Sequence, residues 1–196
     1  MHINSHFAVG VIIASILNYF LKFNLIEFSL TVIFSFICDF DVVFTRYTKE
    51  KNHRMFITHS IIPGCIIIIF GLILNWITLS IIGLVYLIHI IIDTIDWGTN
   101  LLYFQHKQIG FKVLISKEEF ENLSTYLSEY KNNASFFDNK YYNSKGCLIA
   151  ELLLFILMWL FIIIFALPYI LITLVYFLGL YFHLSRHYYL KKIENK

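Results

Sequence analysis

The stretch that decides the fold runs from Ser60 to Ile92 and reads SIIPGCIIIIFGLILNWITLSIIGLVYLIHIII. It contains no Asp, Glu, Lys or Arg. One helix of that length would measure about 50 Å, whereas the hydrocarbon core of a bilayer is about 30 Å thick. The stretch is therefore predicted to fold back on itself. Leu74-Asn75-Trp76 is the expected break, because Asn favours turns and Trp favours the membrane interface.

Other apolar stretches follow the same design. Cys147 to Leu184 has Pro168 near its middle, where the missing amide donor makes a turn cheap, so two more helices are expected there. Phe7 to Leu21 and Leu25 to Cys38 add one helix each. The predicted fold class is all-α: a polytopic membrane helical bundle of about six membrane helices, some of them short, plus a polar helical insert.

The composition supports lipid as the solvent and the bilayer as the partner. Hydrophobic residues make up 59% of the chain and charged residues only 14%, and a soluble domain could not bury that much apolar surface. The net charge of +2 and the absence of basic residues interleaved with aromatics argue against nucleic acid as a partner. Cys38, Cys65 and Cys147 show no CxxC spacing and are predicted to be small buried hydrophobes.

Basic residues predict the orientation. Six spans place the N-terminus, residues 44–58, residues 104–146 and the tail after Leu184 on one side of the membrane. Of the 15 Lys and Arg residues, all but Lys22 fall on that side. By the positive-inside tendency this side is cytoplasmic, so the chain is predicted to be integral to the cytoplasmic (inner) membrane with both termini in the cytoplasm.

Three parts are expected along the chain. Residues 1–103 carry four membrane helices, residues 104–146 form a polar cytoplasmic insert, and residues 147–196 form a helical hairpin with a basic tail. In the insert, Ser116 and Glu119 have the spacing of a capping box, and apolar residues recur down to Tyr130 at helical spacing. One amphipathic helix is predicted there, either on the membrane surface or over a site as a lid, or packed within a solvated linker.

Histidines and aspartates gather at the ends of the first four predicted helices that face the cytoplasm. The set is His6, Asp39, Asp41, His53, His59, His89 and Asp93, with Asp96 one turn later. His89 and Asp93 share a helix face and can hold one ion together. Several carboxylates at a low-dielectric boundary need a counter-charge, which one or two divalent ions (Zn, Mn, Fe or Mg) would supply. Taken singly, each residue also fits an interfacial side chain or a helix cap.

The same residues resemble a known family, the YdjM-type membrane-bound metal-dependent hydrolases. The resemblance is carried by His6, by Asp39-Phe40-Asp41, by the block His53-Arg54-Met55-Phe56-Ile57-Thr58-His59-Ser60, and by His89-Ile-Ile-Ile-Asp93 followed by Gly98. It covers the chain to about residue 105, and the block ending at Ser60 is its most specific part. The sequence departs from the family pattern at Cys38, Val42 and Met55, where Pro, His and Gly are common. The resemblance implies a metal-assisted hydrolase of the inner membrane.

The hypothesis assigns each residue a role. Expected metal ligands are His6, Asp39, Asp41, His59, His89 and Asp93, holding one or two ions that lower the pKa of a bound water toward 7. His53 or Asp96 would move protons. Arg54 would offer donors to a phosphoryl oxygen, or is an ordinary positive-inside residue. A site at the lipid surface favours a phosphoester or lipid-linked substrate.

Two other classes of function share part of this pattern. Intramembrane Asp and His pairs also mark the paths of ion-coupled transporters, although the centres of the six segments are almost entirely Ile, Leu, Phe and Val. A membrane anchor whose insert recruits a partner protein would make the same residues merely interfacial. His106, His183 and His187 lack obvious partners in the sequence and are predicted to be interfacial.

Overall fold

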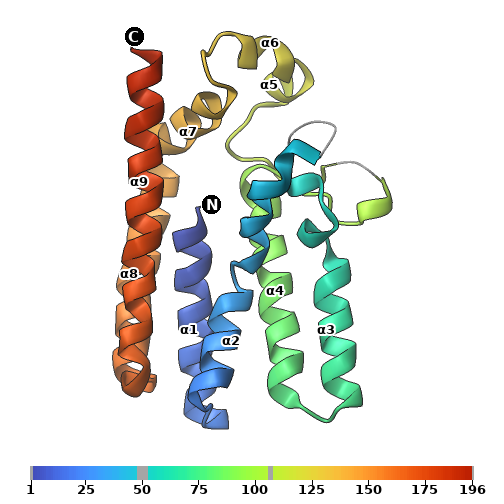
Figure 1. Cartoon of the computed structure of the whole chain (residues 1–196), viewed down its shortest axis with the longest axis vertical. Helices are drawn as coiled ribbons and strands as arrows, with labels where there is room; N and C mark the ends of the chain where they lie inside the picture. The colour runs from blue at the N-terminus through green and yellow to red at the C-terminus, as the bar shows by residue number, and fades with distance from the viewer. Residues whose placement is uncertain (1, 48–52, 106–107, 196) are drawn as a thin grey trace.

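The chain is an all-α bundle with no strand in the part that the structure describes (Figure 1). The computed structural model describes residues 2–47, 53–105 and 108–195. The long elements are α1 (Ile3–Leu21), α2 (Leu25–Phe34), α3 (Ile61–Ile73), α4 (Ile77–Asp96), α8 (Lys145–Phe165) and α9 (Leu174–Glu194). The insert contains α5 (Lys117–Glu121), α6 (Leu123–Ser128) and α7 (Asn133–Asn143). The 3-10 segments are η1 (Ile37–Tyr47), η2 (His53–Met55), η3 (Ile57–His59), η4 (Tyr103–Gln105) and η5 (Leu167–Thr173).

The membrane-helix prediction is confirmed. Among the described residues, four helical segments are long and apolar enough to cross a bilayer: α1, α4, α8 and Leu167–Glu194. A fifth is possible if α2 and Ile37–Thr45, which meet at 45°, count as one bent span. The apolar helix α3 has only 13 residues. The six predicted segments therefore correspond to four spans, one bent pair that can count as a fifth, and one short helix.

The break inside Ser60–Ile92 lies where the sequence predicts it. The backbone of Asn75 is left-handed, with φ 51°, a conformation that Asn tolerates better than most residues. Helix α3 ends two residues before Asn75, and α4 begins two residues after it. The break in the C-terminal hairpin comes slightly earlier than Pro168: α8 ends at Phe165, and the proline lies in the following 3-10 turn η5.

A polar clamp ties α2 to the α3–α4 turn at the end of the bundle far from the insert. Asn24 and Glu27 form a capping box at the start of α2. The Glu27 carboxylate also accepts hydrogen bonds from Thr78 Oγ1 at 2.9 Å and Trp76 Nε1 at 3.4 Å. Because both helix starts are fixed together, α2 and α4 run alongside each other, and η1 reaches the opposite end of α4 (Figure 1).

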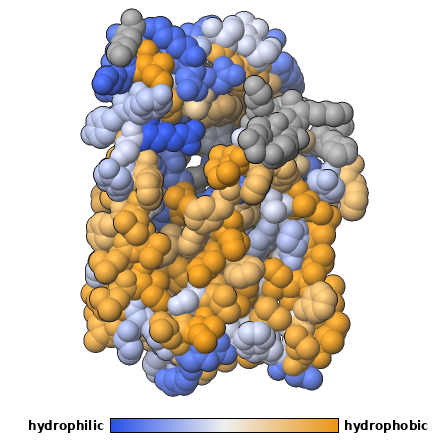
Figure 2. Space-filling view, in the orientation of Figure 1, coloured by the Kyte–Doolittle hydropathy of each residue, from blue (hydrophilic) through white to orange (hydrophobic). Residues whose placement is uncertain are grey.

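The apolar surface is divided between an inner core and an outer face. Val11 and Ala14 of α1 pack with Met158 and Ile162 of α8, and all four are fully buried. Many large aliphatic and aromatic side chains on the outer faces of α3, α8 and α9 are instead exposed. In Figure 2 they form a hydrophobic band between two more hydrophilic ends. This outer face suits contact with lipid tails, as the composition predicts.

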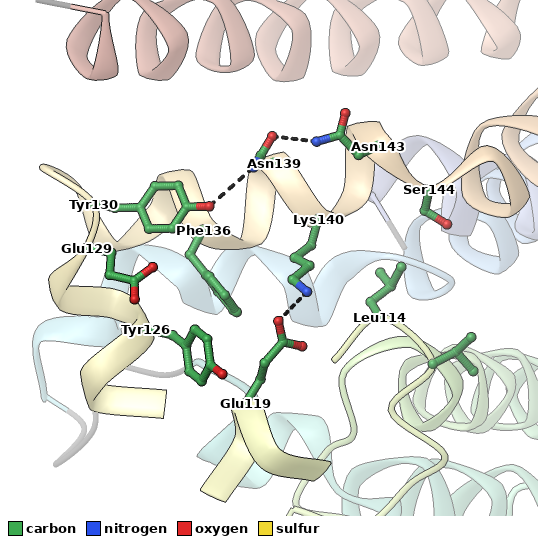
Figure 3. A pocket seen from close by; sticks show the side chains of 11 residues that line it. Leu114, Glu119, Tyr126, Glu129, Tyr130, Phe136, Asn139, Lys140, Asn143 and Ser144 are labelled. Atoms are coloured by element: carbon green, nitrogen blue, oxygen red, sulfur yellow. Dashed lines mark hydrogen bonds and ion pairs between the residues drawn. The ribbon is translucent and has the colours of Figure 1, made fainter. Parts of the chain in front are cut away.

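The insert differs from its predicted single helix. The capping box of Ser116 and Glu119 is present, but the helix stops at Glu121 and restarts at Leu123 as α6, and a third helix, α7, follows. Lys140 of α7 donates to the Glu119 carboxylate, and Figure 3 shows this pair on the wall of a shallow pocket between α5, α6 and α7. Helix α7 in turn packs on α8 and α9. The three helices of the insert thus pack in sequence against one another, and the last of them packs against the C-terminal helices.

The cysteines only partly follow their prediction. Cys38 is buried, as expected, but Cys65 is exposed and Cys147 is half-buried. Both of these lie on helices whose outer faces are apolar, so lipid rather than protein would cover them. All three thiols are free.

Candidate metal centre

Helix α4 supplies two of the site residues from one face. His89 and Asp93 are four residues apart, which brings His89 Nε2 to 3.3 Å from Asp93 Oδ2. The helix ends just beyond them, because Gly98 adopts φ 81°, and its amide donates to the Asp93 carbonyl at 3.1 Å. The pair therefore lies at the end of α4 that faces the insert.

Two further residues reach the same point from η1 and η3. Asp39 Oδ1 lies 3.6 Å from Nε2 of both His59 and His89, and His59 Nε2 lies 3.5 Å from Asp93 Oδ2. One ligand atom from each of the four residues falls within a 4.8 Å group. Four ligands at about 2.1 Å from a tetrahedral ion are separated by about 3.4 Å. The measured spacings therefore suit ligands around one common ion.

The facing atoms lack other partners. His59 Nε2, His89 Nε2 and Asp93 Oδ2 are buried, and none has a hydrogen-bond partner within the described protein. Buried polar atoms are normally paired, since an unpaired one costs about 1–3 kcal/mol. Two imidazoles and two carboxylates also form a donor set that Zn, Mn or Fe accept. These four residues fit a divalent metal ion.

Hydrogen bonds on the far side of each imidazole set its orientation. His89 Nδ1 donates to the Ser35 carbonyl at 2.7 Å, and His59 Nδ1 lies 3.0 Å from Asp41 Oδ2. With the proton on Nδ1, the Nε2 lone pair faces the centre. Ser35 can pack closely against α1 because Gly10 has no side chain: a Cβ there would lie 2.1 Å from Ser35 Oγ.

Two predicted ligands lie beside the four-residue group. Asp41 contacts Nδ1 of His59 and accepts from Thr58, and it belongs to a separate group with His53 and His59. The His6 ring lies against the His89 ring at a tilt of 32°, with centroids 3.8 Å apart, and His6 Nε2 is 3.3 Å from Asp93 Oδ1. Asp41 and His6 thus touch the ligands from outside the four-atom group.

Arg54 is directed at two carboxylates of α4. Its Nη2 donates to Asp93 Oδ1 at 3.0 Å, and its Nη1 donates to Asp96 Oδ1 at 2.9 Å. Nη1 also donates to the Asp93 carbonyl at 3.1 Å, near the end of the helix. This buried guanidinium neutralises both carboxylates and holds Asp93 in place. Arg54 and Asp96, predicted to stabilise a phosphoryl group and to move protons, are here bonded to each other.

The histidines of the 53–60 segment differ in basicity. Burial lowers the pKa of His53 to about 4, and the neighbouring His59 and Arg54 act in the same direction. Burial also acts to lower the pKa of His59, but the nearby carboxylates of Asp39 and Asp41 outweigh that effect and raise it. His53 is therefore a neutral base at pH 7, with its ring centroid 5.0 Å from that of His59.

The loop after α4 fastens the 53–60 segment to the helix end. Thr99 Oγ1 donates to the His59 carbonyl at 2.6 Å, and the Asn100 amide donates to the Arg54 carbonyl at 3.1 Å. The Asn100 side chain donates to the Met55 carbonyl at 3.3 Å. Short 3-10 turns lack the long hydrogen-bond ladders of α-helices and depend on bonds from other segments. His59 is therefore positioned by residues about forty places further along the chain.

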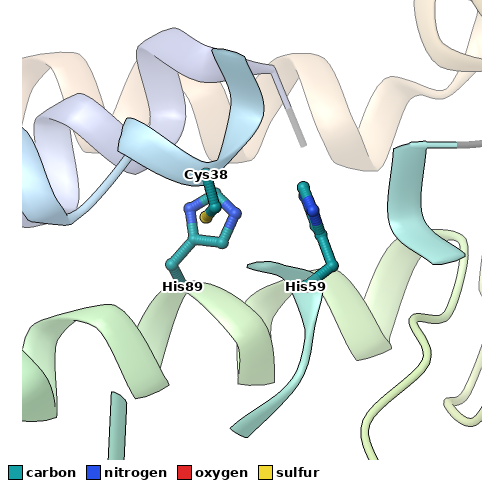
Figure 4. Close-up of side chains that lie close together, drawn as sticks. All are labelled: Cys38, His59 and His89. Carbon is teal, nitrogen blue, oxygen red and sulfur yellow. The ribbon is translucent and has the colours of Figure 1, made fainter. Parts of the chain in front are cut away.

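Several participants were not identified from the sequence. Cys38 lies with its sulfur beside the two imidazoles (Figure 4), and Ser35 acts through its backbone carbonyl, which no sequence pattern reveals. The only sequence signal for Cys38 is its place next to Asp39.

His183 and His187 have partners that the sequence did not indicate, while their interfacial position stays a prediction. His183 Nδ1 lies 2.6 Å from the Tyr142 hydroxyl, and its Nε2 lies 3.5 Å from Glu151 Oε1. His187 Nδ1 lies 2.6 Å from Asp138 Oδ2. We call these five residues the C-terminal histidine cluster. The partners of the two histidines lie on α7 (Asp138 and Tyr142) and on α8 (Glu151). His106 lies outside the described residues.

The fold and the site define a polytopic membrane protein with a buried group of metal-ligand type at one end of its bundle. Comparison with protein families matches residues 1–170 to the family described as YdjM inner membrane protein, so the chain belongs to the YdjM family. The match extends well beyond the motifs, which end at Gly98, and takes in the insert and α8. Searches of curated proteins and of solved structures gave no match.

Proposed function

We propose that this chain is a membrane-bound metal-dependent hydrolase that acts at the cytoplasmic face of the inner membrane on a phosphoester or a lipid-linked substrate. One observation carries the proposal: buried, unpaired imidazole nitrogens of His59 and His89 face carboxylates of Asp39 and Asp93 at 3.3–3.6 Å. A group of this kind, enclosed in an apolar bundle, is costly unless an ion joins its members.

The chain's own residues then have distinct tasks. Asp39, His59, His89 and Asp93 would hold the ion, which when bound supplies a Lewis acid and activates a water for attack at neutral pH. Asp41 and the Ser35 carbonyl orient the two imidazoles, and Arg54 fixes Asp93. His6 and Asp41 remain candidates for a second ion.

The proton balance points to His53. In hydrolysis, the water oxygen bonds to phosphorus while the ester P–O bond breaks, the water loses a proton, and the leaving alkoxide gains one. His53 is neutral at pH 7, and its ring lies next to that of His59, so it can take the first proton and return it to the leaving group.

The experiment is a hydrolysis assay on detergent-purified protein with a panel of phosphomonoesters and phosphodiesters, including phospholipids. Metal-stripped protein should be inactive, and Mn or Zn should restore activity. Asp93→Asn should remove the activity, while His183→Ala, in the C-terminal histidine cluster, should keep it. Activity that survives both stripping and Asp93→Asn would rule the proposal out.

Transport is the rival to test beside it. Protein in proteoliposomes would be assayed for uptake of divalent ions or protons. Uptake that depends on Asp93, together with no hydrolysis of any ester, would mean that the chain is an ion-coupled carrier and not a hydrolase.

A further inference from the structure

Cys38 is the side chain at the metal centre that the proposed hydrolysis does not use. Its sulfur and one nitrogen each from His59 and His89 lie within a 4.8 Å group, and all three residues are buried. Figure 4 shows the sulfur beside the His89 ring, with the His59 ring facing the same space. The thiol is free, and Asp39 follows it directly in η1.

The two imidazoles show which of their atoms are available. Their Nδ1 atoms are taken by the Ser35 carbonyl and by Asp41. Their Nε2 atoms are buried and have no hydrogen-bond partner. A ligand that reaches both rings must therefore meet them on the side where Asp39 and Asp93 also lie. Cys38 and the same two imidazoles form a group of their own that overlaps with the group of Asp39 and Asp93, so an ion bound between the two rings lies within reach of its sulfur.

We propose that Cys38 is a ligand of the ion held by His59 and His89, and that its thiolate makes the centre prefer a thiophilic ion, zinc above all, over magnesium or manganese. This inference rests on the proposed function, because it assigns the metal of the same site. As the sulfur–metal bond forms, the thiol proton leaves to solvent. Thiolate and imidazole together select zinc, whereas carboxylates alone are open to magnesium and manganese.

A purely structural role for Cys38 makes a different prediction. The residue also packs with Tyr86 and Ile90 in a small buried cluster. If packing were its whole purpose, replacing the sulfur would change stability slightly and leave the metal chemistry as it was.

Cobalt(II) substitution separates the two roles, because a cobalt–thiolate bond gives a strong charge-transfer absorption in the near ultraviolet that imidazole and carboxylate ligands do not. Purified wild-type protein would be loaded with cobalt and compared with Cys38→Ser and Cys38→Ala. Cys65→Ser and Cys147→Ser are matched controls, since each removes one free thiol elsewhere. The band should appear in wild type and both controls, and disappear in the two Cys38 variants while cobalt stays bound.

The outcomes distinguish this inference from the function beneath it. Cobalt bound to wild type without the band, or a band that survives in both Cys38 variants, would overturn the assignment of Cys38 and leave the hydrolase intact. No cobalt bound to wild type would overturn the metal centre and Cys38 with it. A competition of zinc against manganese adds a second readout. Loss of the thiolate should lower the ratio of zinc affinity to manganese affinity by about 10-fold or more, at least the size of the effect that loss of an outer-shell partner has on a metal site.

Discussion

Two groups of histidines with acidic partners lie in this molecule, and they are built differently. In the C-terminal histidine cluster, His183 and His187 each have one nitrogen 2.6 Å from a hydroxyl or carboxylate oxygen, and each faces a single acidic residue. At the metal centre, two imidazoles and two carboxylates converge on one point.

The comparison shows that the convergence of several ligand atoms, and not burial alone, sets the candidate metal centre apart. Among the described residues, every group of three or more ligand atoms within 4.8 Å includes His59, and none includes His183 or His187. In the C-terminal cluster, His183 Nε2 and Glu151 Oε1 are also buried without a hydrogen bond, but they face only each other, at 3.5 Å. In the candidate metal centre, hydrogen bonds on the far side of each imidazole leave several ligand atoms facing one point. The predictions below test this contrast, from the largest expected effect to the smallest.

Metal content should separate the two groups completely. His89→Ala removes an inward-facing nitrogen and should reduce bound metal in purified protein to near zero. His183→Ala should leave the metal content at the wild-type level. Elemental analysis of the two variants beside wild type makes the measurement. Equal loss in both would mean that the contrast is wrong.

Stability should respond most strongly to Arg54. Arg54→Met leaves Asp93 and Asp96 buried without their counter-charge and should lower the free energy of unfolding by about 3–5 kcal/mol. Arg186→Met changes an exposed arginine on α9 and should cost no more than about 0.5 kcal/mol. Denaturant unfolding in detergent gives both values. If Asp96→Asn fails to restore part of the loss in Arg54→Met, the charge explanation is incorrect.

The aspartates that orient histidines offer a matched pair. Asp41 lies at His59 and Asp138 at His187, each on Nδ1. Asp41→Asn should weaken metal binding by about 10–100-fold, because it disturbs the orientation and basicity of a ligand. Asp138→Asn should not change the affinity. Titration of metal-stripped protein by calorimetry provides the comparison. An unchanged affinity in Asp41→Asn would remove Asp41 from the site.

The smallest effect belongs to the insert and depends on pH. The Lys140 ammonium and the Ser116 amide lower the pKa of Glu119. A carboxylate with a lowered pKa adds stability above its unfolded pKa, and that contribution is lost as the pH falls through the lower folded value. The protection factors of the α5 amides, which are corrected for the intrinsic exchange rate at each pH, should therefore fall in acid, and Glu119→Gln should show the lower protection already at pH 7. Hydrogen exchange of the amides near the candidate metal centre should be the same in Glu119→Gln as in wild type.

The sequence predicts the framework well because its signals are local. Asn75, Trp76 and the Ser116–Glu119 capping box act through neighbours in the chain, and each lies where it was expected. The gathering of Asp39, His59, His89 and Asp93 follows from helix ends meeting at one side of a bilayer. Their metal-binding role stays a prediction.

Contacts between segments that are distant in the chain could not be predicted from the sequence. Glu151 and Asp138 reach His183 and His187 only because α7 and α8 pack on α9. The direction of Arg54, toward Asp93 and Asp96, depends on how η2 is fastened by the loop at Asn100. The division of the insert at Asn122 depends on packing between α6 and α7, which periodicity cannot express.

The brevity of α3 has a consequence for the surrounding lipid. Thirteen residues rise about 20 Å, a third short of the hydrocarbon thickness, and the helix starts two residues after His59. The bilayer beside α3 has to become thinner, and this brings the phosphate headgroups closer to its centre. The depth of the candidate metal centre below the surface would then vary with acyl-chain length, and the thickness of the host membrane would set how closely lipid headgroups approach it.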